Sequence, residues 1–156
     1  MLIYNNRKNG TKISLITDSN GIPFNVKCYK GNKYDSKILD NHLKNENLID
    51  ITNMMPDKKY FLADPGYDTK AIRDNLKDKN YLTLIPQNAP LVARNIKDKN
   101  KLKKFSKMDK KIYKKRLVIE RTFNNLKVNR RLCLRYESYL SNFIGFIYLA
   151  LIKILC

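Results

Sequence analysis

The sequence predicts an α/β protein, on three observations. Short runs rich in β-branched and aromatic residues, bounded by Gly, Pro, Asn or Asp, have the length and composition of strands. Longer segments repeat apolar residues at helical spacing. Midway along the chain a strand, a helix and a strand follow one another with short links, which favours parallel pairing. The 156 residues are enough for one domain with a substantial core, so we expect a single domain spanning residues 1–156.

The first predicted element is a β-hairpin. Lys12–Thr17 alternates polar and apolar residues, and Pro23–Tyr29 reads as the returning strand. Asp18–Gly21 supplies the turn, because Gly21 can adopt a positive φ at no steric cost. A helix is then predicted over Asp35–Leu43 from the spacing of its apolar residues.

The middle of the chain predicts two buried strands around a helix. After a polar connection over residues 45–59, Tyr60–Ala63 and Tyr81–Ile85 are short continuous apolar runs, typical of strands buried on both faces. Thr69–Lys79 between them has its apolar residues on one face and reads as a helix. From residue 87 the chain turns polar again.

A strong positive charge limits the possible partners. The chain has 32 Lys and Arg against 14 Asp and Glu, a formal net charge of +18. This excess destabilises a compact state by self-repulsion unless a polyanion screens it. Eleven of the basic residues fall between Lys97 and Arg116, where the simplest alternative is a solvated loop. Nucleic acid is the expected partner, because each neutralised phosphate releases condensed counterions.

The cysteines and the apolar C-terminus exclude other classes. Cys28, Cys133 and Cys156 form no CxxC pair and His42 is the single histidine, which argues against a zinc site and for a reducing compartment. The run over residues 143–156 contains Lys153 and is too short for a membrane span, so we expect a buried core helix from about residue 138 and no membrane contact. The start of the chain lacks a secretion signal, which favours a cytoplasmic or nucleoid-associated location.

One predicted helix carries a group of aligned polar residues. At about 100° per residue, Tyr113, Arg116, Glu120 and Lys127 fall at about 0°, 300°, 340° and 320° around a helix axis. An apolar stripe lies beside them, made of Ile112, Ile119, Phe123 and Leu126. A carboxylate is thus presented at the rim of a core among two cations and a phenol. On spacing alone, a solvated charged face is the simpler interpretation.

A second carboxylate stands at the end of a predicted strand. Asp64 directly follows the run Tyr60–Ala63, at the carboxyl end where α/β sheets usually place their sites. Pro65 and Gly66 turn the backbone there, and a simple turn or helix-cap role for Asp64 is the alternative. Carboxylates from a strand end and from Glu120 could converge on Mg²⁺, which prefers oxygen ligands and retains several waters.

These segments resemble a known family. The spacing Tyr113-(2)-Arg116-(3)-Glu120-(6)-Lys127 is similar to the YREK signature of DDE-type insertion-sequence transposases. Residues 63–68, Ala-Asp-Pro-Gly-Tyr-Asp, resemble the segment around that family's second aspartate. The segments 11–23, 31–35 and 85–86 resemble further parts of it, in the same order. The resemblance extends from about Lys8 to Ala150.

The resemblance implies an RNase H-like fold, a mixed sheet flanked by helices. It implies DNA cleavage at transposon ends and strand transfer into target DNA, with two Mg²⁺ (or Mn²⁺) ions as cofactors. Asp64 and Glu120 match the second and third metal-binding acids of the catalytic triad. Tyr113, Arg116 and Lys127 match the remaining signature positions, for which DNA phosphate contact is implied. A homodimer is a further expectation.

The chain departs from the family pattern at the first acid. The family's first aspartate precedes the hairpin, whereas none of the eleven residues before Lys12 is Asp or Glu. Asp18 is the first acid and matches a turn position, so its substitution for the missing ligand is a weak hypothesis. We therefore expect a truncated catalytic domain that lacks its first strand and is inactive alone. The alternatives are a non-enzymatic basic nucleic-acid-binding domain and a non-functional remnant.

Overall fold

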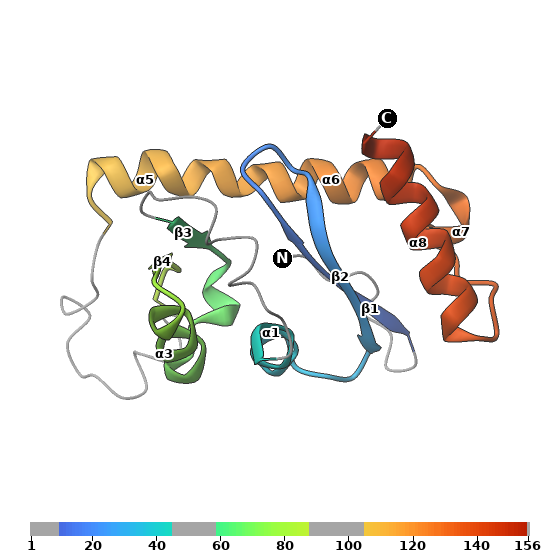
Figure 1. The fold of residues 1–156 in the computed structure, drawn as a ribbon, viewed down its shortest axis with the longest axis horizontal. Coiled ribbons are helices and arrows are strands. Elements are labelled where there is room, and N and C mark those ends of the chain that lie inside the picture. Colours follow the sequence, from blue (N-terminus) through green and yellow to red (C-terminus); the bar gives the residue numbers. More distant parts are fainter. Residues whose placement is uncertain (1–9, 45–58, 88–104, 156) are drawn as a thin grey trace. The chain divides into compact units, whose positions relative to one another are not determined.

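The computed structural model describes residues 10–44, 59–87 and 105–155 of the chain (Figure 1). These residues form two compact units, each with its own internal contacts. The first unit contains the segments up to Gly31 and from Lys115 onward, and the second runs from Asn32 to Lys114. Both contain helices and a pair of strands, so the chain is a mixed α/β protein as predicted. Residues 45–58 of the predicted connection over 45–59, and residues 97–104 of the predicted basic segment over 97–116, lie outside the described part.

The first unit begins with the predicted hairpin. Strand β1 (Thr11–Thr17) pairs antiparallel with β2 (Pro23–Lys30), as the two ribbons in Figure 1 show. The pairing places Leu15 opposite Val26, and its register shifts between Ile16 and Thr17. Alternation along β1 does not separate a buried from an exposed face, because Ser14 is buried together with its neighbours Ile13 and Leu15.

Asp18 organises the turn between the two strands. Its Oδ1 accepts hydrogen bonds from the backbone N–H groups of Asn20 and Ile22, both at 2.8 Å. Gly21 has φ +91°, the left-handed conformation that glycine adopts without steric cost. The predicted turn over Asp18–Gly21, with a positive φ at Gly21, is confirmed. An Asp side chain that bonds the backbone ahead of it is a common turn device, which supports a structural role for Asp18.

The described part of the first unit also contains three α-helices: α6 (Leu117–Lys127), α7 (Arg130–Cys133) and α8 (Leu140–Leu155). They pack on the hairpin through one hydrophobic cluster, whose members from β1, α6, α7 and α8 are Ile13, Leu15, Ile119, Phe123, Leu126, Leu132, Phe143, Ile147, Ala150 and Leu151. Three of the four residues predicted as an apolar stripe, Ile119, Phe123 and Leu126, are therefore buried.

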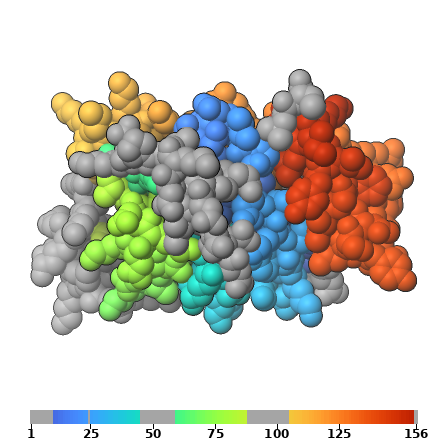
Figure 2. Space-filling view, in the orientation of Figure 1, coloured from blue at the N-terminus to red at the C-terminus, as the bar shows by residue number. Residues whose placement is uncertain are grey.

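Helix α8 is buried on one face only. Phe143, Ile147 and Leu151 belong to the core, whereas Leu149 and Ile152 are exposed. In Figure 2, α8 (red) forms part of the visible surface. The prediction of a core helix is thus confirmed for one face of α8. The apolar run did not reveal that another face is exposed. Of the helices in the described segments, none is long and apolar enough to cross a membrane.

The second unit contains a parallel strand pair. Strand β3 (Lys59–Leu62) pairs with β4 (Tyr81–Leu84), and α3 (Lys70–Asp78) connects them. The parallel order predicted from strand, helix and strand is confirmed. Asn80 ends the helix with φ +59°, and its N–H donates to the carbonyl of Lys77, a common way for a helix to terminate.

Both strands are less buried than their apolar sequences predict. Tyr60 in β3 is 42% exposed and Leu82 in β4 is 44% exposed, so the prediction of strands buried on both faces is wrong. The described part of this unit also contains α1 (Asp35–Lys44), a short 3₁₀ helix η1 (Pro65–Tyr67) and α5 (Lys107–Tyr113). The buried apolar side chains of α1 and α3 are Ile38, Leu39, Leu43, Ile72 and Leu76.

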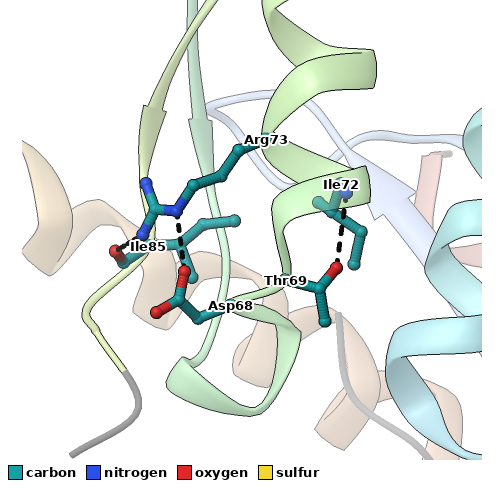
Figure 3. A network of polar contacts seen from close by, with 5 residues as sticks. All are labelled: Asp68, Thr69, Ile72, Arg73 and Ile85. Carbon is teal, nitrogen blue, oxygen red and sulfur yellow. Dashed lines mark hydrogen bonds and ion pairs between the residues drawn. The ribbon is translucent and has the colours of Figure 1, made fainter. Parts of the chain in front are cut away.

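A polar network fixes the turn after β3 to α3 and to the end of β4 (Figure 3). Arg73 Nε lies 2.7 Å from Asp68 Oδ1, and Arg73 Nη2 donates to the carbonyl of Ile85 at 2.8 Å. The Thr69 side chain accepts from the N–H of Ile72 and so caps α3. One planar guanidinium thus holds two segments that follow the two parallel strands.

Replacing Arg73 by Lys should therefore lower the free energy of unfolding by about 1–2 kcal/mol. A single ammonium group cannot reproduce the forked geometry that reaches both Asp68 and the Ile85 carbonyl. Chemical denaturation followed by circular dichroism measures the change. Lys77→Arg on the same helix is the control, since Lys77 is exposed and its effect should stay within about 0.5 kcal/mol. Equal effects of the two variants would contradict a structural role for this network.

Candidate active site

Asp64 lies between the end of β3 at Leu62 and the start of the 3₁₀ helix η1 at Pro65. Its backbone is extended, with φ −71° and ψ 159°, and it occupies the N-cap position of η1. Its side chain makes no capping hydrogen bond, and it is the backbone carbonyl of Asp64 that accepts from the N–H of Tyr67. The carboxylate is half-buried. Asp64 therefore has the position of a turn residue, but the turn does not use its carboxylate as a cap.

Tyr67 is a buried neighbour of this carboxylate. Its pKa is raised above the usual value for tyrosine, first by burial and then by the negative charges of Asp35 and Asp64. The negative charges of both carboxylates therefore raise the pKa of the same phenol, although Asp35 is the first residue of α1 and lies far from Asp64 in the sequence. The sequence indicated Asp35 as the start of a helix and as part of a family segment, but it did not connect Asp35 with the end of β3.

Tyr113 also contacts the end of β3. It is the last residue of α5, and its hydroxyl donates to the backbone carbonyl of Ala63 at 3.3 Å. Its ring packs edge-to-face on Phe105, with 5.4 Å between the centroids. The first residue of the predicted signature is thus beside the residue that precedes Asp64. The spacing of the sequence could not show this contact.

Glu120 and Arg116 form an ion pair. Arg116 Nη1 donates to Glu120 Oε1 at 3.2 Å, across one turn of the chain, with the two side chains 23% and 42% exposed. Glu120 lies in the first turn of α6, where the helix dipole favours a negative charge. Lys127 is the last residue of this helix and is exposed. Of the predicted neighbours of this carboxylate, the contact with Arg116 is confirmed.

The predicted helix over residues 113–127 is interrupted. Tyr113 ends α5, a 3₁₀ helix η3 follows over Lys114–Arg116, and α6 begins at Leu117. A 3₁₀ helix turns by about 120° per residue, where an α-helix turns by about 100°. Glu120 and Lys127 both belong to α6, whereas Tyr113 precedes the 3₁₀ helix, so the predicted alignment of Tyr113 with Glu120 stays a prediction.

Exposed cations surround these signature residues in the sequence. Within the described part of the predicted basic segment, five lysines are exposed, namely Lys107, Lys110, Lys111, Lys114 and Lys115.

Ser106 and Asp109 form a reciprocal capping box at the start of α5. This cap stabilises a helix in a segment that carries many like charges.

The donors available for a metal ion are carboxylates. Asp64 belongs to the second unit and Glu120 to the first. In the three described segments, no group of three or more His, Cys, Asp or Glu side chains is placed to hold a metal ion. Half-buried carboxylate oxygens nevertheless fit the preference of Mg²⁺ for a few protein oxygens together with water. The chemistry of the donors thus suits a hard divalent cation.

Comparison with known proteins identifies the family. The family model described as "Transposase DDE domain" matches residues 3–155, and the chain therefore belongs to this family. A curated relative, "Putative transposase for insertion sequence element IS6501" from Brucella ovis, is 28% identical over 144 residues, which cover 90% of this chain and 93% of the relative. No solved structure matches significantly. Transposase DDE domains act on DNA and generally use divalent metal ions.

Proposed function

We propose that this chain is the catalytic domain of an insertion-sequence transposase that cleaves DNA and transfers strands at transposon ends. The observation that carries the proposal is the family match over residues 3–155. Within it, Asp64 lies two residues after strand β3, and Glu120 lies in the first turn of α6. The proposed architecture is a single RNase H-like domain that contains both units. The proposed partners are transposon-end and target DNA, with a homodimer as the acting form.

Asp64 and Glu120 are the proposed ligands of Mg²⁺ or Mn²⁺. When bound, such ions activate a water and stabilise the leaving oxygen of a phosphodiester. Arg116 is half-buried beside Glu120 and can fix one carboxylate oxygen while its own charge attracts a phosphate. Lys127 is the second proposed phosphate contact. The resemblance implies the same role for Tyr113, whose hydroxyl here donates to Ala63.

The proposed site accounts for two of the three acids of the family's triad. No Asp or Glu precedes Asp18, and the Asp18 carboxylate accepts two backbone hydrogen bonds in a turn. We therefore propose that the chain by itself binds DNA and divalent metal but does not cleave. Two-metal chemistry needs ligands on both ions, and two acids of three are insufficient for it.

The test compares the neutral variants Asp64→Asn and Glu120→Gln with wild type. Each should weaken Mn²⁺ binding by at least about 10-fold, because even groups that only orient a metal ligand typically contribute that much. Electron paramagnetic resonance of free Mn²⁺ gives the affinity. DNA binding without metal should persist in both variants, since each removes a negative charge. In parallel, a nuclease assay with Mg²⁺ or Mn²⁺ on transposon-end duplexes should give background cleavage for wild type.

Asp74→Asn is the matched control, because Asp74 is an exposed carboxylate on α3. It should leave Mn²⁺ affinity unchanged. If Asp64→Asn and Glu120→Gln behave like Asp74→Asn while DNA binding persists, the chain is a basic nucleic-acid-binding domain without a metal site. Cleavage by wild type that both variants abolish would instead contradict the proposed inactivity of the isolated chain and support catalysis by these two acids.

A further inference from the structure

The backbone at the end of β3 is held at three points within the second unit. Ala63 is buried, and its carbonyl accepts from the hydroxyl of Tyr113. Tyr67, which follows Asp64 by three residues in the sequence, is also buried. Asp68 is paired with Arg73, which also holds the segment after β4 (Figure 3). Asp64 thus lies in a short turn whose residues on both sides are fixed by tertiary contacts.

The contact from Tyr113 is the one nearest to the Asp64 carboxylate along the chain. Its acceptor belongs to the peptide unit that joins Ala63 to Asp64, so a change in this hydrogen bond alters the orientation of the Asp64 backbone directly. The hydrogen bond is 3.3 Å long, which is longer than the most common O–H···O distance and indicates a weaker bond. The packing of the Tyr113 ring on Phe105 restrains the same side chain independently of this bond.

The helix that carries Tyr113, α5, has a stabilised start, and this restrains the position of Tyr113. Ser106 accepts from the N–H of Asp109, and the Asp109 side chain accepts from the N–H of Ser106. This capping box begins the helix one residue after Phe105, the residue on which the Tyr113 ring packs. The hydroxyl of Tyr113 is therefore directed at Ala63 by a helix with a stabilised start and by an aromatic neighbour.

From these contacts we propose that Tyr113 is a positioning residue for Asp64, which it orients through the carbonyl of Ala63. The inference rests on the proposed role of Asp64 as a metal ligand and assigns the Tyr113 hydroxyl a task other than contact with DNA phosphate. Removing the hydroxyl should disturb the Asp64 backbone and weaken metal binding, while DNA affinity stays the same.

The test is Tyr113→Phe in the full chain, with Tyr148→Phe as the matched control because Tyr148 is exposed on α8. The ¹³C chemical shift of the Ala63 carbonyl should change in Tyr113→Phe and stay constant in the control. Mn²⁺ affinity, read from paramagnetic broadening of the amide signals of residues 64–67, should fall roughly 2- to 10-fold, the range expected for one hydrogen bond. The dissociation constant for a DNA duplex should remain within about twofold of wild type.

The outcomes separate this inference from the proposed function. An unchanged Ala63 carbonyl shift in Tyr113→Phe would overturn the inference, as would weaker DNA binding with unchanged Mn²⁺ affinity. If wild type shows no Mn²⁺ broadening that depends on Asp64, the metal role in the proposed function fails. In that case a changed Ala63 shift still establishes that Tyr113 orients this backbone. A misfolded Tyr113→Phe would be recognised by altered amide signals throughout the second unit. Phe105→Leu, which keeps the Tyr113 hydroxyl but removes the ring on which Tyr113 packs, would then replace it. An unchanged Ala63 shift together with unchanged Mn²⁺ affinity in that variant would again overturn the inference.

Discussion

Gly21→Ala should lower the free energy of unfolding by about 2–4 kcal/mol. Gly21 has φ +91°, where a residue with a Cβ incurs about 1–3 kcal/mol of strain. An added Cβ would also lie 2.9 Å from both Thr122 Oγ1 and Val118 Cγ1 on α6, and relieving such overpacking typically costs about 1–3 kcal/mol. The smaller conformational entropy of Ala in the unfolded chain offsets part of this. Urea denaturation followed by circular dichroism provides the measurement.

The cause of the expected loss is a close approach between the hairpin turn and α6. Thr122 is buried, and its hydroxyl donates to the carbonyl of Gly21 at 2.9 Å. Because α6 also carries Glu120, this contact fixes the helix on which a proposed metal ligand lies. Only a residue without a side chain leaves room for the hydroxyl to reach the turn.

Gly145→Ala is the matched control with the opposite sign. Gly145 is exposed in α8, and nothing lies within 4 Å of the position a Cβ would take. Alanine in a helix interior is more favourable than glycine by about 0.5–1 kcal/mol, so this variant should be slightly more stable than wild type. If Gly21→Ala were as stable as Gly145→Ala, the turn would not be held against α6 as described.

Local sequence patterns predicted the elements of both units well. The strands, α1, α3 and the turn at Gly21 were each predicted at or near their observed bounds, because alternation, helical spacing and turn residues act over a few positions. The same patterns failed to predict burial, because burial depends on contacts with segments that are distant in the sequence. An apolar run such as Tyr60–Ala63 does not state which faces are covered, and Tyr60 is in fact exposed.

The candidate site shows the same division. The sequence predicted that Arg116 and Glu120 lie on one side of a helix, and a spacing of four residues allows the ion pair that the structure shows. The 3₁₀ helix between α5 and α6 was not predicted, because Lys114, Lys115 and Arg116 contain no Gly or Pro to mark it. The bond from Tyr113 to Ala63 joins residues 50 positions apart and depends on tertiary packing.

DNA binding by this chain should weaken steeply with salt. The net charge of +18 and the exposed lysines on α5 and η3 provide enough cations to neutralise several phosphates. If about 6–10 phosphates are contacted, the affinity should fall by about 10³–10⁵ between 50 and 200 mM salt. Fluorescence anisotropy with a labelled duplex, repeated across this range, gives the slope of log affinity against log salt.

Single lysine variants then locate the contact. Lys127→Gln should reduce the magnitude of the slope by about 1, as expected for the loss of one phosphate contact. Lys77→Gln is the control, since Lys77 is equally exposed but lies on α3 near Asp74 and Asp78, which repel phosphate. Equal slopes for the two variants would mean that DNA responds to the total charge alone. A reduced slope confined to Lys127→Gln would instead place the DNA backbone along the end of the helix that carries Glu120, which is the arrangement that catalysis by this carboxylate requires.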